Sequence, residues 1–162
     1  MLDSYKKLLQ VAQRNKATNK KFLEQLKKQR KPGLDQRMQQ LHEEAFENID
    51  CLQCANCCKT TGPLLLSKDI DRLAGALKMR PSIFAETYLK RDEDGDDVFK
   101  SLPCPFLGSD HYCMVYEARP NACREYPHTH QRDQLQKLKI TYENSLICPA
   151  VAKIVEQLKE FA

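Results

Sequence analysis

The chain has 162 residues, 41% of them hydrophobic and 30% charged, with a formal net charge of +4 at pH 7. This length fits one domain, with or without a small appendage, and the composition is that of a globular chain. No run of 18 apolar residues occurs, which excludes a membrane-spanning helix, and the apolar core is modest enough that the eight cysteines would reinforce it.

The first residues, 1–16, lack the features of a secretory signal. They contain no uninterrupted apolar segment and no cleavage site of small residues. We therefore expect a cytoplasmic protein in a reducing compartment, where stable disulfides are rare. Eight cysteines in such a chain favour metal ligation over disulfide bonds.

Two amphipathic helices are predicted at the N-terminal end, over residues 3–29 and 34–49. In the second helix, apolar residues recur at steps of three or four from Leu34 to Ile49. The segment Lys31-Pro32-Gly33 separates the two helices, because proline and glycine break helical structure. We expect a helical hairpin that forms a first domain, residues 1–48.

Positive charge is concentrated in this hairpin. Residues 1–31 contain ten Lys or Arg and two acidic residues, a net charge of +8, so the remaining residues sum to −4. The favoured interpretation is a solvated helix face, and the next is a protein partner bound by the basic helices. Nucleic acid is disfavoured, because aromatic residues do not interleave with the basic ones as in a base-stacking surface.

Residues 49–162 are predicted to form a small cysteine-cluster domain held together by metal. Further helices are expected at 67–78, 81–89 and 149–161, and short strands at 97–101, 111–116 and 138–142. Ser67 is the expected N-cap of the first of these helices. The predicted fold class is therefore mainly α with short β segments, a metal-stapled domain preceded by the N-terminal hairpin.

Four cysteines lie within eight residues, as Cys51-Leu-Gln-Cys54-Ala-Asn-Cys57-Cys58. The Cys-x-x-Cys spacing lets two thiolates reach one metal ion. Three cysteines at this spacing also match part of the iron–sulfur sequence of bacterial ferredoxins, in which a further cysteine precedes proline. The four remaining cysteines are Cys104, Cys113, Cys123 and Cys148, of which the first and last precede proline. All eight cysteines are therefore candidate metal ligands.

The grouping of these ligands stays open at this point. Eight thiols can fill two four-ligand sites, or one site with thiols left over. If residues 51–58 are helical, Cys51, Cys54 and Cys58 share one face. If the segment is a ferredoxin-like loop, Cys57 joins the first two instead. We expect the cluster segment to supply most ligands of one site, and one or more distant cysteines to complete it.

The order of the cysteine motifs resembles a known family. The motifs are C-x2-C-x2-CC, Pro103-Cys104-Pro105-Phe106-Leu107, Tyr112-Cys113, Arg119-Pro120-Asn-Ala-Cys123-Arg124-Glu-Tyr126-Pro127 and Cys148-Pro149. Together they closely resemble the YkgJ-type cysteine-cluster family, also described as the CxxCxxCC zinc- or iron-chelating domain. The resemblance covers about residues 49–150 and leaves the basic hairpin outside. It implies chelation of zinc or of an iron–sulfur cluster such as [4Fe–4S] through the cysteines.

Two classes of function follow. The first is a metal-binding protein whose metal stabilises the fold or carries electrons. The second is an enzyme or enzyme subunit, because some relatives carry this module beside lysine N-methylation of flagellin. No Gly-rich loop marks a methyl-donor site and no single cysteine is marked as a nucleophile, so the sequence shows no complete catalytic site. A zinc-dependent nucleic-acid binder is a weaker third alternative.

Overall fold

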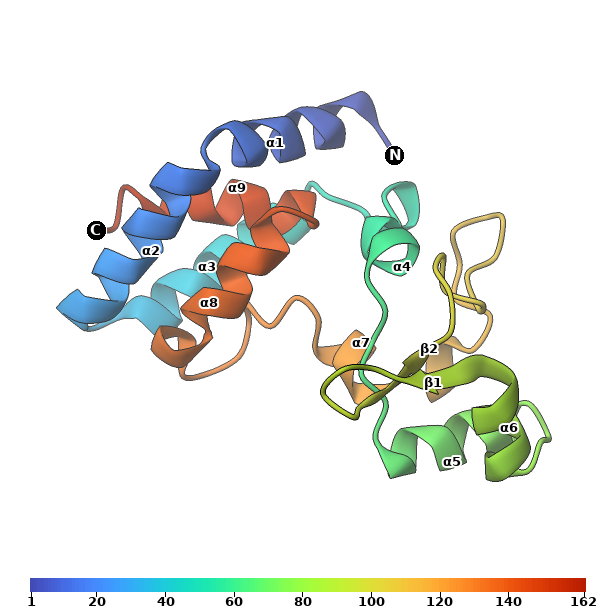
Figure 1. Cartoon of the computed structure of the whole chain (residues 1–162). Coiled ribbons are helices and arrows are strands. Elements are labelled where there is room, and N and C mark those ends of the chain that lie inside the picture. Colours follow the sequence, from blue (N-terminus) through green and yellow to red (C-terminus); the bar gives the residue numbers. More distant parts are fainter. The chain divides into compact units, whose positions relative to one another are not determined.

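A computed structural model describes all 162 residues, and the fold is mainly α-helical with one small two-stranded antiparallel sheet. This confirms the predicted fold class. The chain forms two compact units (Figure 1). Unit 1 consists of Met1–Cys54 and Pro127–Ala162, and unit 2 consists of Ala55–Tyr126. None of the helices combines the length and the apolar character needed to cross a membrane.

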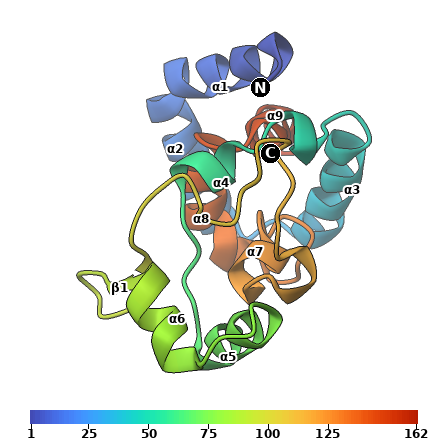
Figure 2. The ribbon, with the colours of Figure 1, turned by 90° about the vertical axis from the view of Figure 1, so that its right-hand side faces the viewer.

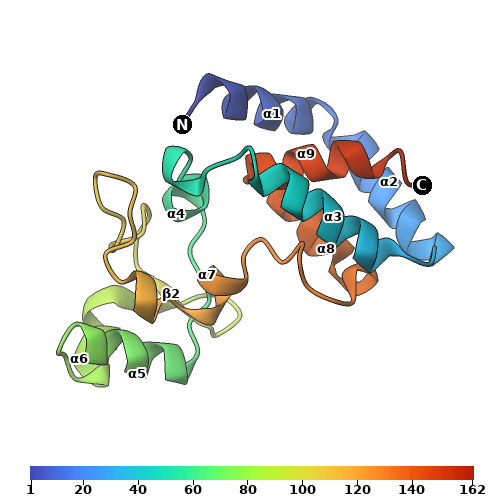
Figure 3. The ribbon, with the colours of Figure 1, turned by 180° about the vertical axis from the view of Figure 1, so that it is seen from behind.

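Unit 1 is a bundle of five helices with one apolar core. The helices are α1 (Asp3–Arg14), α2 (Lys16–Gln29), α3 (Leu34–Phe46), α8 (Gln134–Ser145) and α9 (Pro149–Leu158). Helix α9 packs against α1, α3 and α8, and Figures 1 and 3 show it between α1 and α3. It is the most apolar helix of the bundle, with Ile154 and Val155 fully buried. Burial of apolar surface on α9 therefore holds both ends of the chain together.

The predicted helix over 3–29 is broken once, at Asn15. This residue ends α1 and precedes α2, with φ −89° and ψ 9°. Its side-chain amide donates a hydrogen bond to the carboxylate of Glu156 at 3.2 Å, and the buried Asn19 donates to the same oxygen at 3.1 Å. The polar middle of the segment therefore binds α9, which the periodicity alone did not indicate. The expected break at residues 31–33 is confirmed, with Gly33 at φ 85°.

The compact units do not follow the expected boundary between residues 48 and 49. The hairpin packs on the C-terminal helices, with α1 against α9 and α2 against α8. Its buried apolar residues, among them Tyr5, Leu23 and Leu26, belong to the same core as Val151. As a division of function, the boundary at residue 48 stays a prediction.

Unit 2 contains short elements joined by long loops. They are α4 (Asn56–Thr60), α5 (Ser67–Ala76), α6 (Pro81–Tyr88), β1 (Leu89–Arg91), β2 (Asp97–Phe99) and α7 (Asn121–Glu125). Figure 2 shows α6 leading directly into β1. Leu89 on β1 lies opposite Phe99 on β2. Phe84, Tyr88 and Phe99 surround Phe106, whose ring is 6.1 Å from the stacked ring of Phe84. This aromatic cluster is the core under the cysteine-bearing loops.

Some sequence-based expectations about local structure are wrong. Residues 138–142 lie inside α8, because Leu135, Leu138 and Tyr142 are spaced by three and four and face the unit 1 core. Residues 111–116 form only an isolated bridge, in which Cys113 pairs with Leu107. The N-cap of α5 is Leu66 rather than Ser67.

Candidate metal centres

The eight cysteines are divided between the two units, and none forms a disulfide. The four-cysteine segment is itself split: Cys51 and Cys54 belong to unit 1, whereas Cys57 and Cys58 belong to unit 2. Of the remaining four, only Cys148 lies in unit 1. No three His, Cys, Asp or Glu side chains are already spaced as ligands of one metal ion. The groups described below are therefore defined by hydrogen bonds and by the effect of each thiol's charge on the others.

The unit 2 group consists of Cys58, Cys104, Cys113 and Cys123. Short backbone contacts join the segments that carry them. The N–H of Cys104 donates to the carbonyl of Cys58 at 2.8 Å, and Cys113 pairs with Leu107, whose N–H donates to the carbonyl of Cys104 at 3.1 Å. Cys123 lies in α7, where its N–H donates to the carbonyl of Pro120 at 3.0 Å. Backbone contacts thus join three of the four segments, those of Cys58, Cys104 and Cys113, whereas the backbone contact of Cys123 is local to its own segment.

The charges of these thiols act on one another. Burial and then negative charge on Cys58, Cys104 and Cys113 together raise the pKa of Cys123 to about 12. Burial and then the charges of Cys58 and Cys113 likewise raise the pKa of Cys104. The pKa of Cys113 is raised by burial and by Cys58. Such mutual effects require short separations, so the four thiols form one electrostatic group.

Cys58 is the exception within this group. The thiol of Cys57 donates a hydrogen bond to its sulfur, and this contact lowers the pKa of Cys58 to about 7 despite partial burial. The positive charge of Arg119 contributes to this lower pKa. Cys58 is therefore the thiol of the unit 2 group most easily converted to the thiolate that metals bind.

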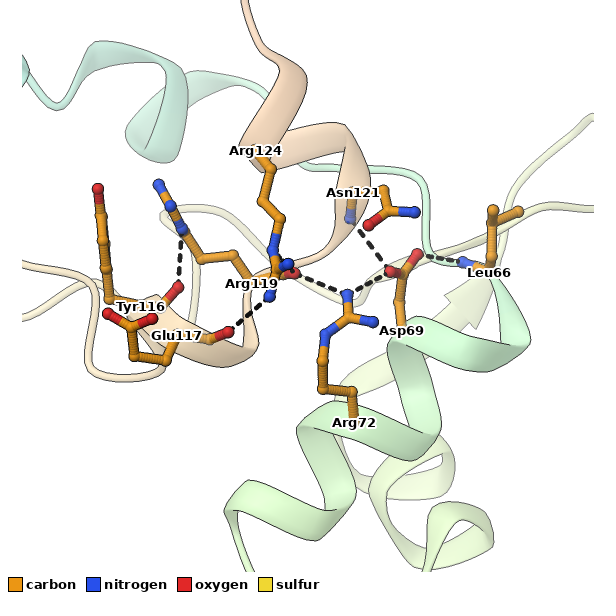
Figure 4. Close-up of polar contacts among 8 residues, drawn as sticks. All are labelled: Leu66, Asp69, Arg72, Tyr116, Glu117, Arg119, Asn121 and Arg124. Carbon is orange, nitrogen blue, oxygen red and sulfur yellow. Dashed lines mark hydrogen bonds and ion pairs between the residues drawn. The ribbon is translucent and has the colours of Figure 1, made fainter.

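Arg119 lies in a polar network that positions the loop before α7 (Figure 4). Its Nε donates to the carbonyl of Tyr116 at 2.8 Å, and its guanidinium lies 3.5 Å above the centroid of the Tyr116 ring. Its own carbonyl accepts hydrogen bonds from Arg72 at 2.8 Å and from Arg124 at 3.1 Å. Its charge lowers the pKa of Cys58, Cys113 and Cys123. The network thus holds a cation beside three thiols of the group.

The carboxylate of Asp69 is the buried centre of this network. It is 1% exposed and accepts hydrogen bonds from the N–H of Leu66 at 2.9 Å, the N–H of Asn121 at 3.1 Å and the guanidinium of Arg72 at 2.7 Å. Burial alone would raise its pKa, but the two N–H groups and Arg72 together lower it. Asp69 therefore stays ionised and ties α5 to the segment that carries Cys123 (Figure 4).

The unit 1 group consists of Cys51, Cys54 and Cys148. The N–H of Cys54 donates to the carbonyl of Cys51 at 3.1 Å across a short 3-10 turn, Cys51–Gln53. Cys54 is buried in the same core against which Cys148 packs, whereas Cys51 is exposed. Burial, with smaller contributions from charges on Cys51 and Cys54, raises the pKa of Cys148 to about 12. The charges of the three thiols therefore act on one another within unit 1.

Two of the cysteines, one in each unit, share a backbone environment. The sulfur of Cys104 accepts hydrogen bonds from the N–H groups of Phe106 and Leu107, two and three residues later. The sulfur of Cys148 accepts them from the N–H groups of Ala150 and Val151, at the same offsets. In both cases the intervening residue is a proline, which has no N–H of its own. N–H donors at these positions stabilise a thiolate and tune a bound metal.

The thiol groups fit a metal cation chemically. In unit 2, three buried thiols oppose one another's ionisation, so all four can be thiolates together only if positive charge lies among them. Arg119 supplies one charge, and a divalent ion or a cationic iron–sulfur core would supply the remainder. Thiolate ligands suit both zinc and iron–sulfur clusters. The donor set is therefore appropriate for either group.

The supporting network was not recognised from the sequence. In the sequence, Asp69 is an acidic residue in the first turn of a predicted helix, which is a common stabilising position and does not indicate a longer-range role. Its contact with Asn121 spans 52 residues, and no local pattern reports such a pairing. The sequence identifies each of the four cysteines of the unit 2 group as a candidate ligand, but their grouping depends on loops whose paths the sequence pattern does not describe.

Comparison with known proteins gives one result. No curated protein and no solved structure matches the chain. The profile of the CxxCxxCC family, described as "Putative zinc- or iron-chelating domain", matches residues 50–149. This range contains all eight cysteines and the Asp69 network, and it covers more than half of the chain. The chain therefore belongs to the CxxCxxCC family of zinc- or iron-chelating domains.

Proposed function

We propose that this chain is a metal-binding protein that holds zinc or an iron–sulfur cluster through up to eight cysteines. The observation that carries the proposal is the unit 2 group, in which Cys58, Cys104, Cys113 and Cys123 come from four separate segments and influence one another's ionisation. Buried cysteines that served only as apolar residues would not need N–H donors at sulfur or a cation beside them. The unit 1 cysteines are proposed ligands of a second centre, and Cys57 supports Cys58.

In this proposal the bound metal stabilises the fold or carries electrons. The core of unit 2 is small and its cysteine-bearing segments are loops, so metal–thiolate bonds would contribute folding free energy. Carbonyl and N–H groups already connect Cys58 with Cys104, which leaves little reorganisation for binding. The eight thiols are proposed to be kept reduced in the cytoplasm.

The test is metal and acid-labile sulfide analysis of the full chain purified without oxygen. Bound metal is expected, with brown colour and sulfide for an iron–sulfur cluster or a colourless zinc protein. The variants Cys104→Ser and Cys123→Ser should each lose metal. Ala122→Ser is the matched control, because it places a serine next to Cys123 without removing a thiol, and it should keep the metal. A wild-type chain that binds neither zinc nor iron would contradict the proposal.

A protein partner for the basic helices is part of the same proposal. The apolar residues Tyr5, Leu23 and Leu26 face the core, which leaves the basic side chains of α1 and α2 at the surface. Such a face suits a partner with an acidic surface. Binding should weaken steeply as salt concentration rises, and it should be lost when Lys20, Lys21, Lys27 and Lys28 are changed to Glu. Retention of binding by that variant would place the contact elsewhere.

A further inference from the structure

A surface cavity adjoins the unit 1 thiol group. Its volume is about 550 Å³, and Cys51 lies in its wall together with Tyr5, Phe46 and Ile49. Cys51 is exposed, whereas Cys54 is 7% exposed and Cys148 is half-buried. The three thiols therefore run from the protein interior to the cavity wall. An ion bound by them would have protein on the side of Cys54 and the cavity on the side of Cys51.

Unit 1 supplies only three thiols to this ion. The cysteines of unit 1 are Cys51 and Cys54, from the four-cysteine segment, and Cys148. The next cysteine in the sequence, Cys57, belongs to unit 2, where its thiol donates to the sulfur of Cys58. Three protein ligands with a fourth position left for water or substrate distinguish reactive zinc sites from purely structural ones.

The charge of the cavity wall restricts what the fourth position can take. Glu47 and Asp50 lie in the wall, and no Lys, Arg or His does. Three thiolates on a divalent ion add a further net negative charge. Anions are therefore repelled, whereas a neutral nitrogen donor is not. Leu2, Phe46 and Ile49 offer an apolar surface for the remainder of such a ligand.

We propose that Cys51, Cys54 and Cys148 form a three-thiolate metal site whose open position faces this cavity and binds a small ligand through an amine or imidazole nitrogen. The inference rests on the proposed function, since it requires that the cysteines bind metal. It adds that the two centres differ: the unit 2 centre is closed by four thiolates, and the unit 1 centre is reactive.

The test uses the full chain loaded with Co²⁺, whose visible spectrum reports its ligands. Titration with imidazole should change the spectrum of about half of the bound cobalt, because only one of the two sites has an open position. Azide, a small anion, should not change it at similar concentrations. A spectrum that responds to azide but not to imidazole would overturn the assigned ligand class.

Two matched variants locate the response. Cys51→Ser should abolish the imidazole response and reduce the bound metal by one equivalent. Because Cys51 is exposed, this change is compatible with folding. Cys113→Ser should remove the other equivalent and leave the response intact. If Cys51→Ser binds as much metal as the wild type, unit 1 holds no centre and the inference fails, although metal binding in unit 2 stands.

A measurement on the unmodified chain guards against variants that misfold. X-ray absorption at the zinc edge should give an average of about 3.5 sulfur ligands per ion for one open and one closed site. An average of about 4 at two zinc ions per chain would mean that both sites are closed, which overturns the inference but not the proposed function. Absence of any metal in the wild type would overturn both.

Discussion

The buried carboxylate of Asp69 accepts a hydrogen bond from the backbone N–H of Asn121, 3.1 Å away and 52 residues further along the chain. Asn121 begins α7, the short helix that carries Cys123. Arg72, paired with the same carboxylate at 2.7 Å, donates to the carbonyl of Arg119. The ionised Asp69 on α5 therefore anchors the chain before Cys123 at two points, directly at Asn121 and through Arg72 at Arg119.

Replacement of Asp69 by Asn should loosen this segment. The change removes the negative charge that Arg72 neutralises, and loss of hydrogen bonds to a charged group costs about 2–3 kcal/mol. The metal-loaded variant should unfold at lower denaturant concentration and release metal faster to a chelator. Asp71→Asn, an exposed position in the same helix, is the control and should behave like the wild type. Equal metal release from both variants would mean that the network does not support the site.

Replacement of Arg119 by Gln should weaken metal binding in unit 2. The positive charge of Arg119 lowers the pKa of Cys58 and Cys113, so its removal raises the pKa of both thiols. Metal must then displace protons that are held more tightly. The loss of metal affinity should therefore be larger at pH 6.5 than at pH 8.5. We expect about a tenfold loss of affinity in a chelator competition assay, the scale usual for residues behind metal ligands.

The matched control for this prediction is Arg119→Lys. It keeps a positive charge but loses the Nε donor to the carbonyl of Tyr116. If charge is what matters, the lysine variant should bind metal more tightly than the glutamine variant. Equal affinities of the two variants would assign the effect to the hydrogen bond and to the contact with the Tyr116 ring instead.

Replacement of Tyr5 by Phe should destabilise unit 1 next to Cys51. The hydroxyl of Tyr5, which is 5% exposed, accepts a hydrogen bond from the N–H of Asp50 at 2.9 Å. Its loss should lower the free energy of unfolding by about 1 kcal/mol in a denaturant titration. Tyr142→Phe is the control, because the backbone carbonyl of Tyr142, not its hydroxyl, accepts the hydrogen bond of Ser145. A Tyr5→Phe variant as stable as the control would contradict the prediction.

Helical content could be predicted from the sequence, because it leaves short-range patterns, whereas the assignment of the eight cysteines as metal ligands stays a prediction. The stripe from Leu34 to Ile49 and the Pro-led start of α9 are local signals, and the structure contains both helices. The association of α1 with α9 could not be predicted, because an amphipathic pattern shows which face of a helix is buried but not which helix packs against it. For the same reason the hairpin was expected to stand apart from the cysteine domain.

The division of the cysteines between the two units could not be predicted from their spacing in the sequence. Cys54 and Cys57 are separated by only two residues, a spacing typical of ligands to one metal. The intervening Ala55 adopts φ 49°, a left-handed conformation that redirects the chain between η1 (Cys51–Gln53) and α4. Nothing in the residue type of alanine indicates such a turn, since Gly or Asn is the usual occupant.

Acidification should destabilise unit 1 through His42. Its Nδ1 is 2.8 Å from the hydroxyl oxygen of the buried Thr129, and its ring centroid is 5.1 Å from that of His130. Burial and then the charge of His130 lower its pKa below 6.5, against a smaller opposite effect of Glu43. The unfolded chain therefore takes up a proton first, and stability is lost as the pH falls below about 6.5.

The measurement compares the denaturation midpoint of the wild type with that of His42→Gln between pH 8 and pH 5.5. Acidification should remove any stabilisation by bound metal from both proteins to a similar extent. The difference between their denaturation midpoints therefore reports the titration of His42. The midpoint of the glutamine variant should fall less. His130→Gln removes the charged neighbour and should give an intermediate slope. Parallel curves for all three proteins would show that His42 titrates alike in the folded and unfolded chain.

Unit 1 is assembled from residues on both sides of unit 2, and this has a consequence for synthesis on the ribosome. All five cysteines of unit 2 are translated before α8 and α9 exist. During that interval the apolar faces of α1, α2 and α3 have no partner, while unit 2 already has every ligand it needs. If the proposed centres form, the nascent chain can load the unit 2 centre early, and the proposed unit 1 centre must wait for Cys148 to emerge. Scarcity of metal during translation would then affect the two centres at different times.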